Sequence, residues 1–254
     1  SWERIRDEFF KILSSENPAD GVLLLKQTGL LASILPEIVA CFSVEQKSPE
    51  RHHIYDVGTH LIETLRNCTS SDPITRFAAL LHDVGKKDTA ETDPETGIIT
   101  FYNHEIVGAN IANSIAERFR LSKKERFKLV KLVRYHMFSV SELQTDKALR
   151  RFIRKVGLEN LEDILLIRTA DRVGSGALET SWRTELFKKR LIDVQKEPFE
   201  IKDLKISGTD VMEILEIKPG RRIGDILKEI FEEVEEKKLE NERDVLLERV
   251  KKYI

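Results

Sequence analysis

The chain has 254 residues, a formal net charge of −2 at pH 7, and 41% hydrophobic and 34% charged residues. This balance is typical of a globular protein with its own core and excludes a disordered chain. No stretch approaches the roughly 18 consecutive apolar residues that cross a bilayer, so we expect no membrane partner. Cys41 and Cys68 form no CxxC pair, which predicts two buried free thiols and a cytoplasmic location.

Apolar residues recur every three to four positions along most of the chain, which predicts helices. Asp72-Pro73, Ser122 and Ser207 are typical helix starts, where a side-chain oxygen accepts the first free backbone amides. In chain order, helices are predicted at residues 2–13, 21–31, 34–42, 54–68, 73–86, 104–120, 123–136, 146–156, 161–173, 178–194, 207–219, 223–239 and 242–253. The predicted fold class is therefore all-α.

One segment breaks the helical pattern. Residues 93–97 read Asp-Pro-Glu-Thr-Gly, which is typical of a turn, and residues 98–101 favour a short strand. We predict a small hairpin or an ordered loop near residues 89–101. Linkers are predicted at residues 46–51 and around Pro198.

His82 and Asp83 follow the apolar run at residues 77–81, on a helix that we expect to be buried. Burying an imidazole and a carboxylate is costly unless a partner such as a metal ion compensates them. His60 lies on an earlier predicted helix and Asp171 lies within a later apolar one. Three helices therefore each offer a side chain suited to a divalent ion.

His104 begins a predicted helix and His136 ends one, which adds two possible ligands. Four ligands would leave open positions for water and substrate, whereas all six would hold two ions with Asp83 as the bridge. Mixed nitrogen and oxygen ligands favour Mn, Ni, Co, Fe or Zn over Mg. His52 and His53 are predicted to be surface residues or supports of the site. The candidate metal ligands are His60, His82, Asp83, His104, His136 and Asp171.

Two cations lie next to these ligands in the sequence. Lys86 is four residues after His82, one helical turn on, and Arg172 follows Asp171. A cation beside a metal site suits a phosphate group. We therefore predict that Asp83, Lys86 and Arg172 are catalytic in metal-dependent hydrolysis of phosphoester bonds.

The pattern His60…His82-Asp83…Asp171 resembles the HD superfamily of metal-dependent phosphohydrolases over roughly residues 50–185. This resemblance implies a small phosphoester or nucleotide substrate, such as a 2′,3′-cyclic phosphate or a 2′-nucleotide, or a damaged RNA end. A hydrolase of free nucleotides or of an alarmone is a further alternative.

A narrower resemblance covers nearly the whole chain. Short motifs are similar to the neck, the HD-bearing middle and the tail of bacterial tRNA nucleotidyltransferases and poly(A) polymerases; they lie at residues 3–8, 29–37, 101–109, 134–137, 206–210, 219–224 and 241. The resemblance implies an RNA-binding-like helical neck at residues 1–48, an HD phosphohydrolase domain at 49–195, and a tRNA-binding-like helical tail at 196–254. It also implies tRNA as a partner.

The departure from that family is large, because its nucleotide-adding head carries an Asp-x-Asp pair that occurs nowhere in this sequence. We therefore expect a head domain that is truncated or on another chain, and no polymerisation by this chain alone. Two hypotheses follow from the resemblance. The chain is an HD phosphohydrolase region, or it is the tRNA-binding module of a CCA-adding enzyme or poly(A) polymerase with a non-catalytic HD site.

Residues 118–155 contain 13 Lys or Arg and 3 Asp or Glu. Such a run is either a pair of solvated helix faces or a track for a phosphate backbone. The interleaved Phe119, Phe127, Tyr135 and Phe152 have helical spacing, which is more typical of a core than of base-stacking platforms. The residues predicted to contact RNA are Lys123, Lys124, Arg126, Arg150, Arg151 and Arg154.

Overall fold

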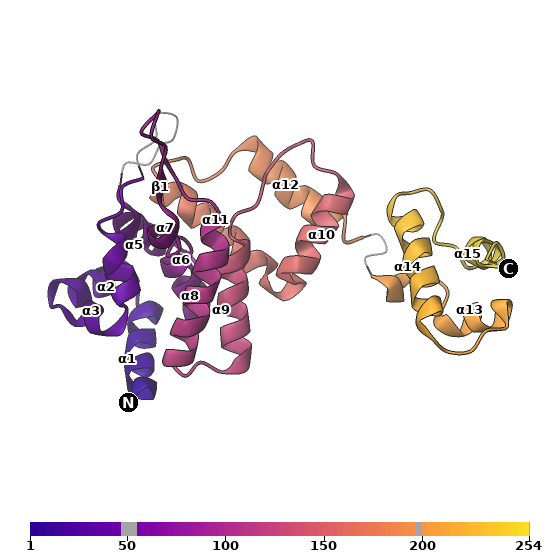
Figure 1. Cartoon of the computed structure of the whole chain (residues 1–254), viewed down its shortest axis with the longest axis horizontal. Helices are drawn as coiled ribbons and strands as arrows, with labels where there is room; N and C mark the ends of the chain where they lie inside the picture. The colour runs from indigo at the N-terminus through magenta and orange to yellow at the C-terminus, as the bar shows by residue number, and fades with distance from the viewer. Residues whose placement is uncertain (47–54, 197–199, 254) are drawn as a thin grey trace. The chain divides into compact units, whose positions relative to one another are not determined.

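A computed structural model describes residues 1–46, 55–196 and 200–253 (Figure 1). The chain forms two compact units, Ser1–Ser139 with Lys155–Ser181, and Val140–Arg154 with Trp182–Ile254. Helices dominate both units, and the sheet found among the described residues has two strands, so the all-α prediction is confirmed. The predicted linkers and the predictions for His52 and His53 fall wholly or largely outside the described residues.

The first unit contains α1 (Trp2–Ser14), α2 (Pro18–Gln27), α3 (Leu30–Ile34), α4 (Pro36–Cys41), α5 (Val57–Asn67), α6 (Pro73–Leu81), α7 (Lys86–Thr89), β1 (Glu91–Thr92), β2 (Ile99–Thr100), α8 (His104–Arg118), α9 (Lys123–Tyr135), the 3-10 turn Leu158–Asn160 and α11 (Leu161–Gly174). The second contains α12 (Trp182–Asp193), the 3-10 turn Ile201–Asp203, α13 (Gly208–Leu215), α14 (Arg221–Glu235), α15 (Arg243–Lys251) and most of α10 (Asp146–Val156). Across the described residues, no helix is long and apolar enough to cross a membrane.

Side-chain caps begin three helices where the sequence predicts them. Asp72 accepts hydrogen bonds from two amides in the first turn of α6, and Pro73 is the first residue of that helix. Ser122 caps α9 and Ser207 caps α13, each in a reciprocal capping box with an acidic residue three positions on. These helix starts follow from local hydrogen bonding.

The segment predicted as one helix over residues 73–86 contains a turn. α6 ends at Leu81 and α7 begins at Lys86, so Lys86 does not lie one regular helical turn beyond His82 as the sequence suggested.

Gly85 allows this turn to pack against α8. A Cβ atom at Gly85 would lie 2.2 Å from the carbonyl oxygen of His104 and 2.5 Å from the amide nitrogen of Gly108. Only a residue without a side chain permits such an approach of two backbones. The contact brings His104 close to Asp83.

Gly174 allows α11 to pack closely against α5. A Cβ atom at Gly174 would lie 2.9 Å from the amide nitrogen of Thr64 and 3.1 Å from the carbonyl carbon of Glu63. Asp171 and His60 lie about one turn earlier on the two helices, so the same contact brings them together. Gly174 thus serves in helix packing, and residues 175–176 form a turn.

Replacing Gly174 by alanine is expected to lower the free energy of unfolding by about 1–3 kcal/mol, because the added methyl group must push α11 from α5. Gly224 in α14 is a matched control, since a Cβ atom there meets no atom within 4 Å. We expect Gly224→Ala to raise stability by about 0.5–1 kcal/mol. Urea denaturation compares the two variants, and equal effects would contradict the packing role of Gly174.

An aromatic cluster joins α1, α6 and the end of α8. The ring centroids of Phe9, Phe77 and Phe119 lie 5.4–5.7 Å apart, and all three side chains are buried. Phe119 is therefore a core residue, as its spacing predicts. Both cysteines are also buried and free, and burial raises the pKa of Cys41 to about 12, which keeps this thiol unreactive.

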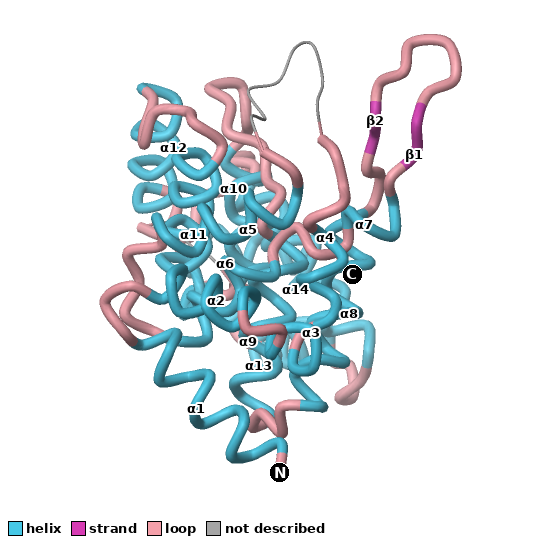
Figure 2. The backbone as a smooth tube through the Cα atoms, turned by 90° about the vertical axis from the view of Figure 1, so that its left-hand side faces the viewer, coloured by secondary structure: helices cyan, strands magenta, loops and turns pink. Residues whose placement is uncertain are grey.

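The predicted hairpin is present. β1 and β2 pair antiparallel, with Glu91 opposite Thr100 and Thr92 opposite Ile99, and the hairpin projects beyond the nearby helices (Figure 2). The Asp93 carboxylate accepts two amides of the turn, and Gly97 has a φ of 68°. The turn residues read from the sequence thus perform the expected role.

The C-terminal helices have a small core of their own. Its buried side chains come from α13, α14, α15 and the segment before α13; they are Leu204, Ile206, Val211, Ile223, Ile226, Ile230, Phe231, Val234, Leu246 and Val250. At its edge the Arg243 guanidinium pairs with the Asp210 carboxylate, which also caps α13 through Ser207.

These contacts predict a pH dependence. Hydrogen bonds from the Ser207 backbone and from Arg243 lower the pKa of Asp210 from 3.8 to about 2. Because the folded pKa is depressed, the stabilisation is complete above pH 4 and is lost as the pH falls through about 2. Hydrogen exchange of peptides within residues 204–253 should therefore show less protection in Asp210→Asn than in the wild type at pH 5. The difference should shrink between about pH 4 and pH 2, and a constant difference would contradict this prediction.

Candidate metal centre

The six predicted ligands converge in the first unit. His60 lies in α5, His82 and Asp83 in the turn after α6, His104 at the start of α8, His136 directly after α9 and Asp171 in α11. Five of them are at most 5% exposed, and the Asp171 side chain is 20% exposed. The sequence thus identified a set of side chains that the fold gathers from five helical segments, although metal binding itself stays a prediction.

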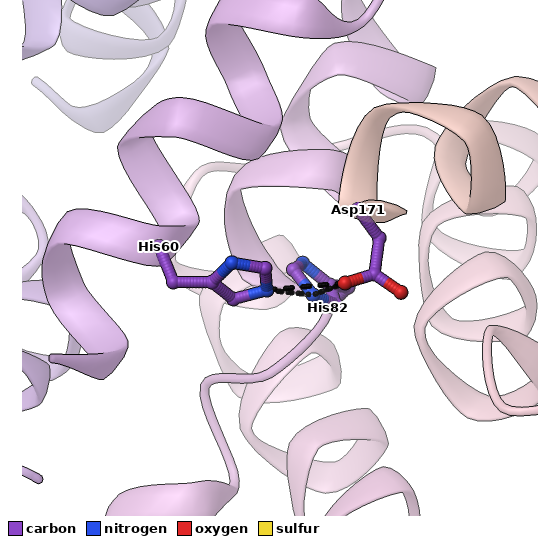
Figure 3. A group of neighbouring side chains, drawn as sticks. All are labelled: His60, His82 and Asp171. Carbon is purple, nitrogen blue, oxygen red and sulfur yellow. Dashed lines mark hydrogen bonds and ion pairs between the residues drawn. The ribbon is translucent and has the colours of Figure 1, made fainter. Parts of the chain in front are cut away.

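The first group of candidate ligands is His60, His82 and Asp171 (Figure 3). The Nε2 atoms of the two histidines lie 3.1 Å apart, and His60 Nε2 lies 3.2 Å from Asp171 Oδ1. His82 Nε2 lies 3.8 Å from the same oxygen. Three ligand atoms therefore point at one small space between α5, α6 and α11.

The second group is Asp83, His104 and His136. Asp83 Oδ1 lies 3.1 Å from His104 Nε2 and 3.3 Å from His136 Nε2. The two imidazole nitrogens lie 3.4 Å from each other.

Asp83, a member of the second group, also lies beside the first. Its second oxygen, Oδ2, lies 3.5 Å from His60 Nε2 and 3.3 Å from His82 Nε2. One carboxylate oxygen thus faces each group, which is the arrangement that a carboxylate bridging two ions requires. A lone ion held by the first group alone would leave the second oxygen and two buried imidazoles without a role.

Backbone carbonyls orient three of the imidazoles. The Nδ1 atoms of His82, His104 and His136 lie 2.7–2.8 Å from the carbonyl oxygens three residues before them. A carbonyl only accepts a hydrogen bond, so each Nδ1 carries the proton and each Nε2 presents its lone pair to the cluster. The Nε2 lone pairs of His104 and His136 and the Asp83 oxygen can therefore meet at one cation, and a divalent ion fits this donor set.

The charges within the cluster are strongly coupled. Burial by itself would raise the pKa of Asp83, but the ammonium of Lys86 and the neighbouring imidazoles hold it well below its usual range. Burial would likewise lower the pKa of His82, yet the Asp83 carboxylate outweighs it and the pKa is raised. For His136, burial prevails and the pKa is lowered. The carboxylate therefore stays ionised, as a metal ligand must.

Lys86 lies behind Asp83 and is itself buried. Its ammonium is 2.6 Å from Asp83 Oδ2 and donates a hydrogen bond to Gln46 Oε1 at 2.9 Å. The predicted role as a free cation for a substrate phosphate therefore does not fit the geometry. Lys86 instead holds Asp83 in place, and Gln46, which sequence reasoning missed, completes this support.

The position of Arg172 also differs from the prediction, because its Nε donates to the carbonyl oxygen of Leu178. Arg168 takes the expected place, with Nη1 3.5 Å from Asp171 Oδ2. A spacing of three residues on one helix is the sequence signal that would have found Arg168.

Two family models match the chain. The model described as tRNA nucleotidyltransferase domain 2 matches residues 95–250, and one described as "Probable RNA and SrmB- binding site of polymerase A" matches residues 1–42. The chain belongs to the tRNA nucleotidyltransferase family. The narrower of the two resemblances is thus confirmed at the level of the family, while membership of the HD superfamily stays a prediction.

Curated relatives in this family support the assignment. The chain is 33% identical to an A-adding tRNA nucleotidyltransferase of Deinococcus radiodurans, over 91% of the chain and 54% of the relative. It is 34% identical to a CC-adding tRNA nucleotidyltransferase of Thermus thermophilus, over 91% of the chain and 52% of the relative. A multifunctional CCA protein of Methylococcus capsulatus is 34% identical over 70% of the chain and 42% of its own length. The chain spans about half the length of these relatives.

The basic run at residues 118–155 is the segment in which the sequence predicts RNA contacts. Most of its cations form ion pairs with carboxylates from other elements. The ion pairs join Arg118 to Glu37, Arg126 to Glu117, Lys128 to Asp72 and Asp163, Lys131 to Glu159, Arg134 to Glu105, Lys147 to Glu236, and Arg154 to Glu235. The run therefore does not form one continuous positive track.

In the first unit, Lys123 and Lys124 are exposed at the start of α9. Neither has a carboxylate within ion-pair distance in the described part of the chain, and the same holds for the exposed Arg120. Arg126 is half-buried and is held by Glu117. Two of the three residues predicted here to contact RNA are thus free to do so.

In the second unit, the prediction that Arg150 contacts RNA is wrong. Its side chain is 1% exposed, and its guanidinium donates to the carbonyl oxygens of Val194 and Glu235. Arg154 is paired with the Glu235 carboxylate, whereas Arg151 is exposed. A long aliphatic stem and five donors allow an arginine to serve as a core residue, which composition alone does not reveal.

Proposed function

We propose that the chain is the tRNA-binding part of a tRNA nucleotidyltransferase and that it does not add nucleotides by itself. The observation that carries this proposal is the match of the two family models over residues 1–42 and 95–250. The relatives named above are A-adding and CC-adding enzymes that act on tRNA. The absence of an Asp-x-Asp pair from the sequence supports the second half of the proposal.

The exposed cations supply the electrostatic part of this binding. Arg120, Lys123 and Lys124 lie together around the turn from α8 to α9, and none of the three forms an ion pair with a carboxylate among the described residues. Cations that are not already paired gain most from contact with phosphates, because they release condensed counterions without breaking an ion pair. Recognition of this kind follows the shape of a folded RNA.

A mobility-shift titration of the chain with full-length tRNA tests this proposal. We expect binding that weakens steeply and log-linearly with salt, and no incorporation of labelled ATP or CTP into the tRNA. The proposal would be refuted if the chain bound tRNA no more strongly than it does in the presence of competing heparin. It would also be refuted if the chain by itself extended the tRNA.

A second candidate function, hydrolysis of phosphoester bonds at the candidate metal centre, is favoured by the shared position of Asp83 between two ligand groups. Divalent ions bound there would supply polarisation of a phosphoryl oxygen and a water of lowered pKa. The chain's own residues would have three roles: Asp83 would bridge the two ligand groups, Lys86 would keep Asp83 ionised, and Arg168 would pair with Asp171. Small phosphoesters such as 2′,3′-cyclic phosphates suit this chemistry.

Hydrolysis of a generic phosphodiester with Mn²⁺, Ni²⁺ or Co²⁺ tests this candidate. We expect turnover that depends on added metal and disappears in His82→Ala, which removes a ligand that is buried and carbonyl-oriented. Turnover without added metal, or equal rates in His82→Ala and the wild type, would mean that a contaminant hydrolyses the substrate. Either result would exclude this site.

A further inference from the structure

Phe127, on the second turn of α9, is 60% exposed, although its helical spacing predicts a core position. Phe119, which precedes it in the same basic run, is fully buried. Several large apolar side chains among the described residues are exposed, so exposure by itself does not indicate a ligand. What points to a ligand at Phe127 is the groove that its ring lines and the cations around that groove.

The Phe127 ring forms part of a groove of about 550 Å³ between α9 and α8. The other lining residues are Asn113, Leu121, Lys123, Arg126 and Val130. Lys123, Phe127 and Val130 follow one another at helical spacing, so they share one face of α9. The volume lies within the range of pockets that hold small ligands, and a nucleobase fits it.

Positive charge surrounds this groove. Lys131 Nζ lies 4.8 Å from the centroid of the Phe127 ring. Lys124 is three residues before Phe127 in the sequence. Arg120 and Lys123 are exposed beside the turn that connects α8 to α9. An apolar ring flanked by cations complements an unpaired nucleotide, whose base stacks on the ring while its phosphates meet the cations.

We infer that this groove binds an unpaired nucleotide of RNA, with its base stacked on Phe127 and its flanking phosphates on Lys123, Lys124 and Arg120. This inference rests on the proposed tRNA-binding function and adds a specific class of ligand to it. The groove is separate from the candidate metal centre, because none of its lining residues is a candidate ligand, and Lys123 at its far end lies 13 residues, about 20 Å along the helix, from His136. Figure 1 shows the α8–α9 turn at the end of the helical pair away from the hairpin.

Fluorescence titration of the full chain with a single-stranded RNA hexamer that carries one 2-aminopurine tests the inference. Stacking on an aromatic ring changes the emission of this base, so the wild type should alter it on binding. Phe127→Leu keeps an apolar side chain but removes the ring plane, and we expect hexamer affinity to fall about 10-fold. Phe127→Trp should restore both affinity and the emission change. Because Phe127 is exposed, all variants should retain the wild-type thermal melt.

Trp182 is a matched control, since it is 63% exposed and Arg183 lies 5.0 Å from its ring centroid. Trp182→Leu should leave hexamer affinity unchanged. Equal hexamer affinity of Phe127→Leu and the wild type, or an equal loss in Trp182→Leu, would overturn the inference. A groove that instead takes a protein segment would give the first of these outcomes.

Binding of the wild-type chain to tRNA tests the proposed function independently of the groove. If the wild type binds tRNA but Phe127→Leu binds tRNA and hexamer equally well, the groove fails and the proposed function stands. If the wild type binds the hexamer through Phe127 but does not bind tRNA, the groove stands and the proposed function fails. If the wild type binds neither RNA, both fail.

Discussion

Replacing Asp83 by asparagine should reduce divalent-metal binding by at least about 100-fold, because a neutral amide replaces the one carboxylate that faces both ligand groups. It should also lower the free energy of unfolding of the metal-free chain by about 3–5 kcal/mol, since the buried ammonium of Lys86 loses its partner. Isothermal titration with Mn²⁺ or Ni²⁺ measures the first effect and urea denaturation the second.

Two further variants separate metal binding from stability. Asp83→Asn combined with Lys86→Met removes both charges, so stability should recover while metal binding stays lost. Asp163→Asn removes a carboxylate that also pairs with a lysine, Lys128 at 2.6 Å, but lies outside both ligand groups. It should leave metal affinity unchanged. Retention of the wild-type metal content by Asp83→Asn would contradict the bridging role.

Reversing the two exposed lysines at the start of α9, Lys123→Glu with Lys124→Glu, should weaken tRNA binding by about 10- to 100-fold near 100 mM salt. It should also reduce the slope of log affinity against log salt by about 2, one unit for each lost phosphate contact. Neither lysine has a carboxylate partner among the described residues, so the change breaks no ion pair there. Glutamate in the first turn of a helix interacts favourably with its dipole, so α9 should remain folded.

Lys188→Glu with Lys196→Glu is the matched control, because it changes the net charge by the same amount. These lysines already pair with Glu185 and Asp193 three residues away. If tRNA binding depends on the local surface, this control should retain most of the wild-type affinity. Equal losses in both double variants would show that only net charge matters.

The candidate metal centre was predictable as a list of residues but not as a geometry. An imidazole and a carboxylate after an apolar helix are costly to bury alone, and this local rule pointed to His82 and Asp83. The roles of the neighbouring cations were not predictable in the same way. Lys86 lies beside Asp83 after a turn that interrupts the helix, and at Gly85 this turn makes a close backbone contact with α8.

The proposed RNA-binding surface shows the same limit more clearly. Sequence counts gave thirteen cations over residues 118–155, but a count cannot show which carboxylates from distant segments lie beside them. Asp163 reaches Lys128, and Glu37 reaches Arg118, across 35 and 81 residues of sequence. Arg120, Lys123 and Lys124 near the α8–α9 turn, together with Lys155, form no such ion pair in the described part of the first unit.

By itself, the sequence determined the helical class, the helix starts at Asp72, Ser122 and Ser207, and the hairpin, because caps and turns arise from hydrogen bonds within a few residues. It also named the six candidate ligands. The tertiary structure decided that Asp83 faces both ligand groups, that Arg150 is buried, and that Phe127 is exposed. These outcomes depend on contacts between helices far apart in sequence, which local periodicity does not record.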